Sequence, residues 1–209
     1  SPPWRIDLLT SIDGVSFDEA WPEYAWRQTR LAHQDASTRT GRTYALPAAA
    51  SRGGQLTLVG EQGLVMRSAD NGQHWQQLAS FYNGSLFGVV RLSAQRWVTY
   101  GMRGHVFVTE DFGEHWQAIE VGNRQPLYGH VLLADNAGVL IVGAGSSMVR
   151  LDDHARLLGT SRQPGLGTLT AAVVVGGDQV LVAGERGVYQ GSGNSVAVQG
   201  KGEQSHETR

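Results

Sequence analysis

The sequence predicts an all-β fold made of four-stranded units that repeat about every 41 residues. The first marker of this period is the pair SADNGQHW and TEDFGEHW, in which Asp111 follows Asp70 by 41 residues. The second marker is a glycine that ends a short apolar run in each unit, at Gly60, Gly101, Gly143 and Gly184. Four-stranded units of this length, repeated around a circle, describe a β-propeller.

Each unit contains four short strands joined by tight turns. In the unit around Gly101, the runs LFGVVRL, WVTYG and HVFVT are followed by TEDFGEHW and a short final strand. The other units contain corresponding runs, among them LTLVG, VLIVG and VLVAG. β-Branched and aromatic residues within short runs bounded by glycine favour strands over helices. Regular repeats are therefore predicted over residues 43–200.

A chain of 209 residues is long enough for one domain with a sizeable core, and we expect that domain to span residues 1–200. At the length of this repeat, the chain supplies about five blades, as a small propeller or as part of a larger ring. Residues 18–42 interrupt the repeat and are interpreted as an irregular insertion, with a short helix considered around 23–33. The tail 201–209 has no apolar anchor and is expected to be disordered.

Composition excludes several kinds of partner and site. A net charge of −2 provides no basic field for nucleic acid or for an anionic membrane surface. The chain has no cysteine, which excludes disulfides and thiolate metal sites. No apolar run approaches the ~20 residues that a membrane span needs, so direct membrane insertion is not expected. No cofactor is predicted.

The repeated aspartate motif can be explained as a structural turn. A hydroxyl can cap a free amide, an aspartate can accept N–H bonds, a glycine can supply a positive φ, and a tryptophan can cover the hairpin. These roles fall in order on Ser68, Asp70, Gly72 and Trp75 in one copy, and on Thr109, Asp111, Gly113 and Trp116 in the other. Glu110, Glu114 and His115 lie at positions that the repeat does not fix, and we expect them to be solvated.

The motif weakens toward both ends of the chain. In the third unit, LDDHARLL aligns Asp153 with the loop aspartate, but Ala155 and Leu158 replace the glycine and the tryptophan. In the fourth unit, SGNSVAVQ keeps only Ser192 and Asn194. Near the N-terminus, SIDGVSF at residues 11–17 is interpreted as a copy that is one residue shorter.

Metal and nucleotide sites explain these motifs less well. A calcium loop would need a glutamate six residues past the glycine, where Leu78 and Ile119 stand. His74 and His115 occupy equivalent places in neighbouring units, which should be too far apart to share a zinc ion. VLIVGAGSSM at residues 139–148 lacks the third glycine of a dinucleotide fingerprint and lies on the repeat register. No metal site is predicted.

The motif S/T-x-D-x-G-x-x-W resembles the Asp-box, or bacterial neuraminidase repeat. The longer pattern G-x-x-G-x-V-x-x-S/T-x-D-x-G-x-x-W is similar to propellers of the photosystem II stability and assembly factor family, including relatives in bacteria that do not photosynthesise. This resemblance covers roughly residues 43–190. It implies a non-catalytic interaction scaffold, exported to the periplasm or outside the cell, with a protein partner in a membrane-associated complex.

Sialidases also carry Asp-boxes, so a sialidase-like glycoside hydrolase or a glycan-binding propeller is the alternative. That resemblance implies an arginine triad, an aspartate acid/base and a Tyr–Glu pair. The usual Arg-Ile-Pro before the first box is approached only by Arg5-Ile6-Asp7. No catalytic residue is therefore assigned.

Propellers bind through the loops at the ends of their central channel. The short turns after the marker glycines form one set of such loops. Arg103 and Arg186 occupy the same turn position in the second and fourth units. Glutamates in the same set balance these arginines, which suits a protein surface better than a small anion. The candidate binding face consists of Glu61, Gln62, Met102, Arg103, Glu185 and Arg186.

Overall fold

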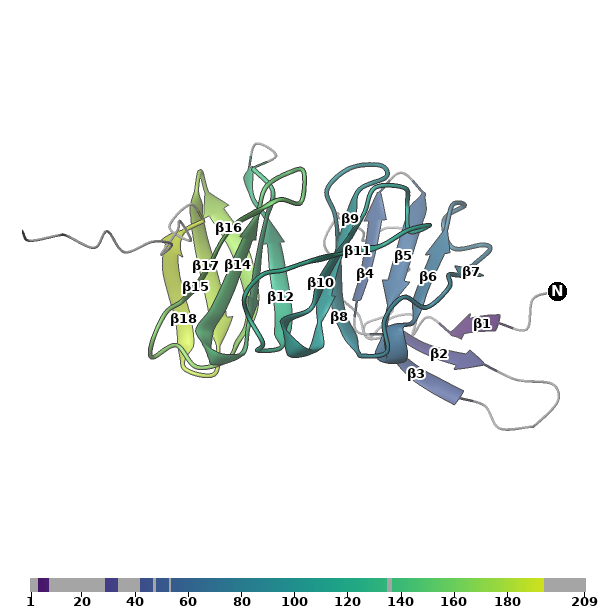
Figure 1. Cartoon of the computed structure of the whole chain (residues 1–209), viewed down its shortest axis with the longest axis horizontal. Helices are drawn as coiled ribbons and strands as arrows, with labels where there is room; N and C mark the ends of the chain where they lie inside the picture. The colour runs from purple at the N-terminus through teal and green to yellow at the C-terminus, as the bar shows by residue number, and fades with distance from the viewer. Residues whose placement is uncertain are drawn as a thin grey trace, which may run out of the picture. The chain divides into compact units, whose positions relative to one another are not determined.

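The computed structural model describes residues 54–134 and 137–193 in full, together with the backbone of four earlier strands. These strands are β1 (Trp4–Asp7), β2 (Thr29–His33), β3 (Arg42–Leu46) and β4 (Ala48–Arg52) (Figure 1). The first three form an antiparallel sheet in chain order. The helix considered around 23–33 is wrong at the residues of β2. The shortened motif at 11–17 and the tail 201–209 lie outside the described residues.

The chain divides into two compact units. The first comprises Ser1–Met102 and Val106–Ala118, and the second comprises Arg103–His105 and Ile119–Arg209. The expectation of a single domain over residues 1–200 stays a prediction.

The first unit carries two four-stranded sheets. One has the order β4-β5-β6-β7 and is completed by β5 (Gln55–Val59), β6 (Val65–Ser68) and β7 (Gln76–Gln77). The other contains β8 (Leu86–Arg91), β9 (Trp97–Gly101), β10 (Val106–Thr109) and β11 (Gln117–Ile119), also in chain order. β8 packs against β4 and β5. The core between the sheets is built from Val59, Val65, Leu78, Leu86, Val89 and Trp97.

The second unit carries two further sheets. The first contains β12 (Leu127–Leu132), β13 (Val139–Gly143), β14 (Ser147–Leu151) and β15 (Leu157–Arg162). The second contains β16 (Leu169–Gly176), β17 (Gln179–Gly184) and β18 (Gly187–Ser192). β16 packs against β12 and β13. The prediction of four-stranded units is confirmed for three sheets, and the described part of the last sheet has three strands.

The marker glycines are explained by close backbone contacts. A Cβ atom at Gly143 would lie 2.1 Å from the carbonyl oxygen of Pro126, and one at Gly184 would lie 2.1 Å from that of Thr168. Gly101 has the same kind of contact in the first unit. Because a carbon atom cannot approach a carbonyl oxygen so closely, the end of each strand requires glycine.

The dinucleotide alternative is wrong. Residues 139–148 span β13 and the start of β14, which pair as an antiparallel hairpin instead of forming a strand followed by a helix. The helical segments of the described residues are short 3-10 turns: η1 (Glu61–Gly63), η2 (Met102–Gly104) and η4 (Ala144–Ser146). Within that part of the chain, no helix has the length and apolar character that crossing a membrane requires.

Candidate functional site

The first aspartate loop, residues 68–75, is closed by hydrogen bonds between its own side chains and backbone. Ser68 is buried at the end of β6, and its hydroxyl donates to Asp70 Oδ1 at 2.8 Å. The Ser68 hydroxyl oxygen also accepts the N–H of Gly72 at 2.9 Å. Asp70 Oδ1 also accepts the N–H of His74 at 2.9 Å. The hydroxyl and the carboxylate together hold the turn closed.

The second aspartate loop, residues 109–116, has the same network. Thr109 Oγ1 donates to Asp111 Oδ1 at 2.8 Å and accepts the N–H of Gly113 at 2.9 Å. Asp111 Oδ1 accepts the N–H of His115 at 2.9 Å. Identical contacts at two places in a repeat are expected of a structural turn, because each turn must satisfy the same free backbone amides.

Hydrogen bonding keeps both loop aspartates ionised. The backbone N–H of His74, followed by its imidazole, lowers the pKa of Asp70 to about 2. The backbone N–H of His115 likewise lowers the pKa of Asp111 to about 2. The Asp111 carboxylate in turn raises the pKa of His115, whose Nδ1 lies 2.7 Å from Oδ2. Carboxyl groups that ionise so readily are poor general acids near neutral pH.

Two consecutive residues in each loop adopt left-handed backbone angles. Asn71 has φ 59° and Gly72 has φ 83°, while Phe112 has φ 57° and Gly113 has φ 92°. The sequence motif predicted a positive φ for the glycine alone. Asparagine tolerates this conformation better than phenylalanine does. Phe112 is held by packing, with its ring centroid 5.4 Å from that of Trp97.

The loop tryptophans lie over the loop glycines. A Cβ atom at Gly72 would lie 3.5 Å from Trp75 Cζ2, and one at Gly113 would lie 3.7 Å from Trp116 Cζ2. Trp116 also donates its indole N–H to the carbonyl of Gly113 at 3.1 Å and stacks on Phe81 at a centroid distance of 4.8 Å. Both tryptophans are half-buried, so they connect the hairpin to the sheet.

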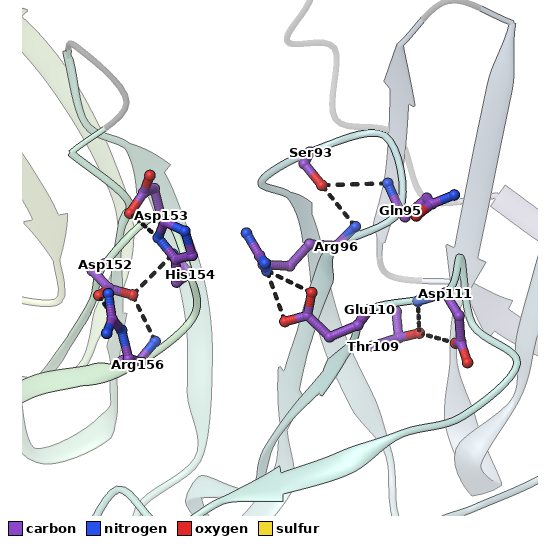
Figure 2. Close-up of polar contacts among 10 residues, drawn as sticks. All are labelled: Ser93, Gln95, Arg96, Thr109, Glu110, Asp111, Asp152, Asp153, His154 and Arg156. Atoms are coloured by element: carbon purple, nitrogen blue, oxygen red, sulfur yellow. Dashed lines mark hydrogen bonds and ion pairs between the residues drawn. The ribbon is translucent and has the colours of Figure 1, made fainter.

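The variable positions of the second loop are exposed, but they are paired with other side chains. Figure 2 shows Arg96 holding both carboxylate oxygens of Glu110, at 2.7 and 2.9 Å from Nε. Glu114 forms an ion pair with Arg67 of β6, and His115 bonds to Asp111. The expectation that these side chains are solvated agrees with their exposure, and the pairing adds contacts that the sequence did not indicate. Exposed ion pairs of this kind contribute only ~0–1 kcal/mol each.

The third loop uses a different aspartate from the one that the sequence alignment selected. Asp152 Oδ1 accepts the N–H of His154 at 2.9 Å and that of Arg156 at 2.7 Å. Asp153 instead contacts His154 Nδ1 at 2.7 Å (Figure 2). Ala155 takes the left-handed position with φ 59°. The assignment of Asp153 was therefore wrong by one residue, because the third loop reaches β15 after fewer residues.

Asp152, Asp153 and His154 are the one group of three potential metal ligands found among the described residues, with ligand atoms within 4.8 Å of one another. Their contacts are explained within the loop, since Arg156 Nε donates to Asp152 Oδ2 at 2.9 Å. A guanidinium bound to this carboxylate already neutralises the charge that would attract a cation. We assign no metal site here.

The candidate binding residues lie on hairpin turns with unusual backbone angles. The second residue of three turns is left-handed: Gln62 (φ 55°, ψ 33°), Arg103 (φ 58°, ψ 22°) and Gly145 (φ 61°, ψ 31°). In the first turn, Leu64 N–H donates to Glu61 O at 3.1 Å. These angles are those of a type I′ turn, which matches the twist of a β-hairpin. The turn side chains Glu61, Gln62, Met102 and Arg103 are exposed.

One connecting segment, residues 80–85, anchors two turns of the first unit. Gly63 N–H donates to Gly84 O at 2.7 Å, and Met102 N–H donates to Ser85 O at 2.9 Å. The hydroxyl of Tyr82 donates to Met102 O at 3.3 Å. This segment therefore bonds both to the exposed turn η1 and to Met102. No sequence pattern identified Tyr82, because residues 80–85 lie between the repeated motifs.

The fourth turn differs from the other three. Gly184 pairs directly with Gly187, so only Glu185 and Arg186 form the loop. Glu185 Oε2 accepts the N–H of Thr168 at 2.9 Å, and this bond lowers the pKa of Glu185. Arg186 donates to Gly165 O at 3.2 Å. Arg186 is thus not structurally equivalent to Arg103, although the two align in the sequence.

Arg67 is the main structural residue that the repeat pattern did not identify. Its guanidinium donates to the carbonyl of Phe112 at 2.8 Å and to Gln76 Oε1 at 3.0 Å, and it also reaches Glu114. These contacts connect the first sheet to the second aspartate loop. The corresponding residue of the next repeat is Val108, so comparison of the repeats gave no signal.

Comparisons with known proteins were made by sequence and by structure. A scan against models of known protein families gives no match, and a search of curated proteins gives none either. The structure is similar to YCF48 bound to D1 peptide, with TM-score 0.50 and 17% identity over 76% of this chain and 59% of that chain. It is also similar to YCF48 from Cyanidioschyzon merolae, with TM-score 0.53 and 13% identity over 87% and 67% of the two chains. An ancestral GH74 enzyme has TM-score 0.60 and 10% identity over 73% of this chain and 23% of that enzyme.

These similarities establish the fold class. The chain is an all-β protein with a β-propeller fold built from four-stranded antiparallel sheets, so the predicted fold class is confirmed. The chain spans 59% of the length of the peptide-bound YCF48 chain. Identities below a fifth establish no activity, because propellers carry many unrelated functions.

Proposed function

We propose that this chain is a non-enzymatic scaffold that binds a peptide segment of a protein partner. The observation that supports this most directly is the shared anchoring of η1 and Met102 by residues 80–85. The binding surface proposed in the first unit consists of Glu61, Gln62 and Met102, with Tyr82 beside them. Glu61 and Gln62 are exposed, and the Met102 residue is 40% exposed to solvent.

The chemistry of this surface suits a peptide. Met102 offers a flexible apolar side chain that adapts to different partners. Gln62 offers both hydrogen-bond donors and acceptors to a peptide backbone, and Glu61 adds one negative charge. The type I′ turn and its backbone bonds hold these groups before binding, which reduces the entropy lost on association.

The wider biological role is proposed from resemblance. YCF48 has been solved with a D1 peptide, and its structure is similar to this one. The aspartate loops match the Asp-box pattern, and this supports placing the chain near the photosystem II assembly factor-like propellers. On this basis we propose an exported accessory or assembly factor of a membrane-associated complex.

The proposal is tested with fluorescence anisotropy, using the D1 peptide of the YCF48 structure and an array of peptides from membrane proteins of the host. Met102→Glu should weaken binding of any captured peptide by about tenfold, equivalent to ~1.4 kcal/mol, while the melting temperature stays unchanged. Leu158→Glu, on the exposed strand β15, is the matched control and should leave peptide binding unchanged. Equal binding by wild type and Met102→Glu would exclude this surface.

The hydrolase alternative is tested on the same protein. We expect no turnover of fluorogenic sialosides or other common glycosides, because the loop aspartates are held ionised by their own turn contacts. Turnover that survives repeated purification would overturn the non-enzymatic proposal.

A further inference from the structure

The sequence contains two asparagine–glycine pairs, Asn71–Gly72 and Asn83–Gly84, and both asparagines are exposed. An asparagine followed by glycine is chemically labile, because glycine has no Cβ to hinder attack by its backbone nitrogen on the preceding side chain. The two pairs share this chemistry, but the fold gives them different backbones and different hydrogen bonds. The same reaction therefore meets different obstacles at the two sites.

The first pair is held by the first aspartate loop. Asn71 has φ 59° and Gly72 has φ 83°. In the left-handed helical region, Cβ lies on the opposite side of the Cα–C bond from the following nitrogen, so the Asn71 side chain points away from it. The Gly72 N–H donates to Ser68 Oγ at 2.9 Å, and the Asn71 N–H donates to Gly54 O at 2.8 Å. Attack at Asn71 requires that the loop first opens.

The second pair has neither of these constraints. Asn83 and Gly84 lie between strands, and neither has a positive φ. Within the part of the chain that the structure describes, the N–H of Gly84 donates no hydrogen bond. Gly84 is held through its carbonyl instead, which accepts the N–H of Gly63 at 2.7 Å. The nitrogen that would react is therefore available without opening a turn.

The fold also requires glycine after Asn83. A Cβ atom at Gly84 would lie 2.2 Å from the hydroxyl oxygen of Tyr82. The Tyr82 side chain is restrained, since its hydroxyl donates to Met102 O at 3.3 Å and its ring centroid lies 5.1 Å from that of Phe107. The packing of Tyr82 thus maintains the labile pair.

We propose that Asn83 is a site of spontaneous deamidation in the folded protein, while the identical pair at Asn71 is protected by its loop. The Gly84 nitrogen loses its proton to a solvent base and attacks Asn83 Cγ. The N–Cγ bond forms, the Cγ–Nδ2 bond breaks, and Nδ2 takes a proton from water and leaves as ammonia. A second water opens the resulting five-membered ring at either carbonyl carbon, which gives aspartate or isoaspartate.

The isoaspartate product has a direct structural consequence. Its main chain runs through Cβ and Cγ, which adds one carbon between Tyr82 and Gly84. The carbonyls of Gly84 and Ser85 accept the N–H groups of Gly63 and Met102, so both anchors follow the lengthened segment. Deamidation should loosen these anchors and add one negative charge. The reaction acts on the surface of the proposed function, but it takes place whether or not that surface binds a peptide.

The first test ages the full chain in mildly alkaline buffer and follows both asparagines by peptide mapping with mass spectrometry. Asn83 should convert at least about tenfold faster than Asn71, because attack at Asn71 must wait for the loop hydrogen bonds to open. The chain unfolded in urea is the control, and there the two rates should be similar. Equal rates in the folded protein would overturn the proposal, as would conversion of Asn83 in the unfolded chain alone.

The second test removes the protection of the first pair. Ser68→Ala deletes the acceptor of the Gly72 N–H and should accelerate conversion of Asn71 by about fivefold, while Asn83 keeps its rate. Thr109→Ala makes the equivalent change in the second loop and is the matched control that should leave Asn71 unchanged. Circular dichroism melts verify that both variants stay folded during ageing. Equal acceleration of Asn71 by both variants would contradict protection by its own loop.

The third test follows the structural consequence by hydrogen exchange. The amides of Gly63 and Met102 should exchange faster in the isoaspartate fraction than in fresh protein. Asn83→Asp adds the same charge without lengthening the main chain, so it should keep both amides protected. Asn83→Gln would have to close a larger ring and should stay unmodified during ageing. Unchanged protection in the isoaspartate fraction would refute the loosening of the two anchors. None of these measurements uses a peptide, so their outcome is separate from that of the peptide-binding proposal.

Discussion

The strands β13 and β17 occupy equivalent positions in consecutive repeats, yet their surroundings differ. Every residue of β13, VLIVG, is buried. In β17, QVLVAG, buried residues alternate with partly exposed ones. Both strands end at a glycine required by a close carbonyl contact, and both carry leucine at the equivalent position, Leu140 and Leu181. The repeat fixes the strand, whereas the neighbouring sheet decides how much of it is buried.

The comparison explains why similar apolar runs have different consequences. A strand covered on both faces tolerates no polar side chain on either, while a strand covered on one face tolerates polar residues on the other. β17 nevertheless carries leucine and alanine on its less buried face. The apolar side chains of β17 therefore follow the repeat pattern and not the burial of that face.

The largest expected effect is a difference between two leucine truncations. Leu140→Ala should destabilise the protein by ~2–5 kcal/mol, because the side chain is fully buried and a cavity would remain. Leu181→Ala should cost ~1 kcal/mol, since that side chain is only partly buried. Urea unfolding of both variants checks the difference. Equal losses of unfolding free energy would mean that the two leucine side chains are buried to the same extent.

The strands and their turns could be predicted from the sequence because local signals determine them. Gly101, Gly143 and Gly184 marked the strand ends, and each proved to need glycine for a close backbone contact. Alternation of β-branched and aromatic residues then located the strands between them. The aspartate loops followed from a motif whose hydroxyl and carboxylate hydrogen bonds lie within eight residues.

Features that depend on distant contacts or on register could not be predicted in this way. Arg67 bonds to residues more than 40 positions away, and no second copy of it exists in the next repeat. Asp152, and not the aligned Asp153, closes the third loop because that loop is shorter. An alignment with a fixed period does not reveal the change in length. Arg186 aligned with Arg103, but the two-residue hairpin at Glu185 changed its backbone and its contacts.

The second expected effect concerns the two hairpins. Gly187 has φ 118°, an angle that residues with a side chain rarely adopt, whereas Gly145 has φ 61° in the left-handed helical region. Gly187→Ala should therefore destabilise the protein more than Gly145→Ala, which should cost ~1–2 kcal/mol. Gly145→Asn should cost less than Gly145→Ala, because asparagine tolerates the left-handed region. Thermal unfolding followed by circular dichroism checks this order. The reverse order would contradict the conclusion that the backbone at Gly187 requires glycine more strictly than the backbone at Gly145 does.

The smallest expected effect is on how stability depends on pH in acid. It compares Asp152, in the sheet β12–β15, with Asp178, in the sheet β16–β18. The pKa of Asp152 is lowered, since the N–H and guanidinium of Arg156 and the N–H of His154 together outweigh its desolvation. The pKa of Asp178 is lowered mainly by the hydroxyl of Ser192 and then by the amide of Gln179. A lowered folded-state pKa means that protons bind the unfolded chain more tightly. Each carboxylate therefore stabilises the fold above pH ~4, and this contribution is lost as the pH falls through the folded-state pKa.

Asparagine at either position retains an acceptor oxygen but does not titrate over this range. Asp152→Asn should flatten the loss of stability as the pH falls below ~4 more than Asp178→Asn, because Asp152 accepts backbone donors that unfolding removes together. Asp178 is bound by exposed side chains, whose hydrogen bonds water can replace. Urea unfolding at a series of pH values measures both slopes. A greater flattening by Asp178→Asn would mean that the side-chain bonds near β18 persist in water as firmly as the backbone bonds of the third loop.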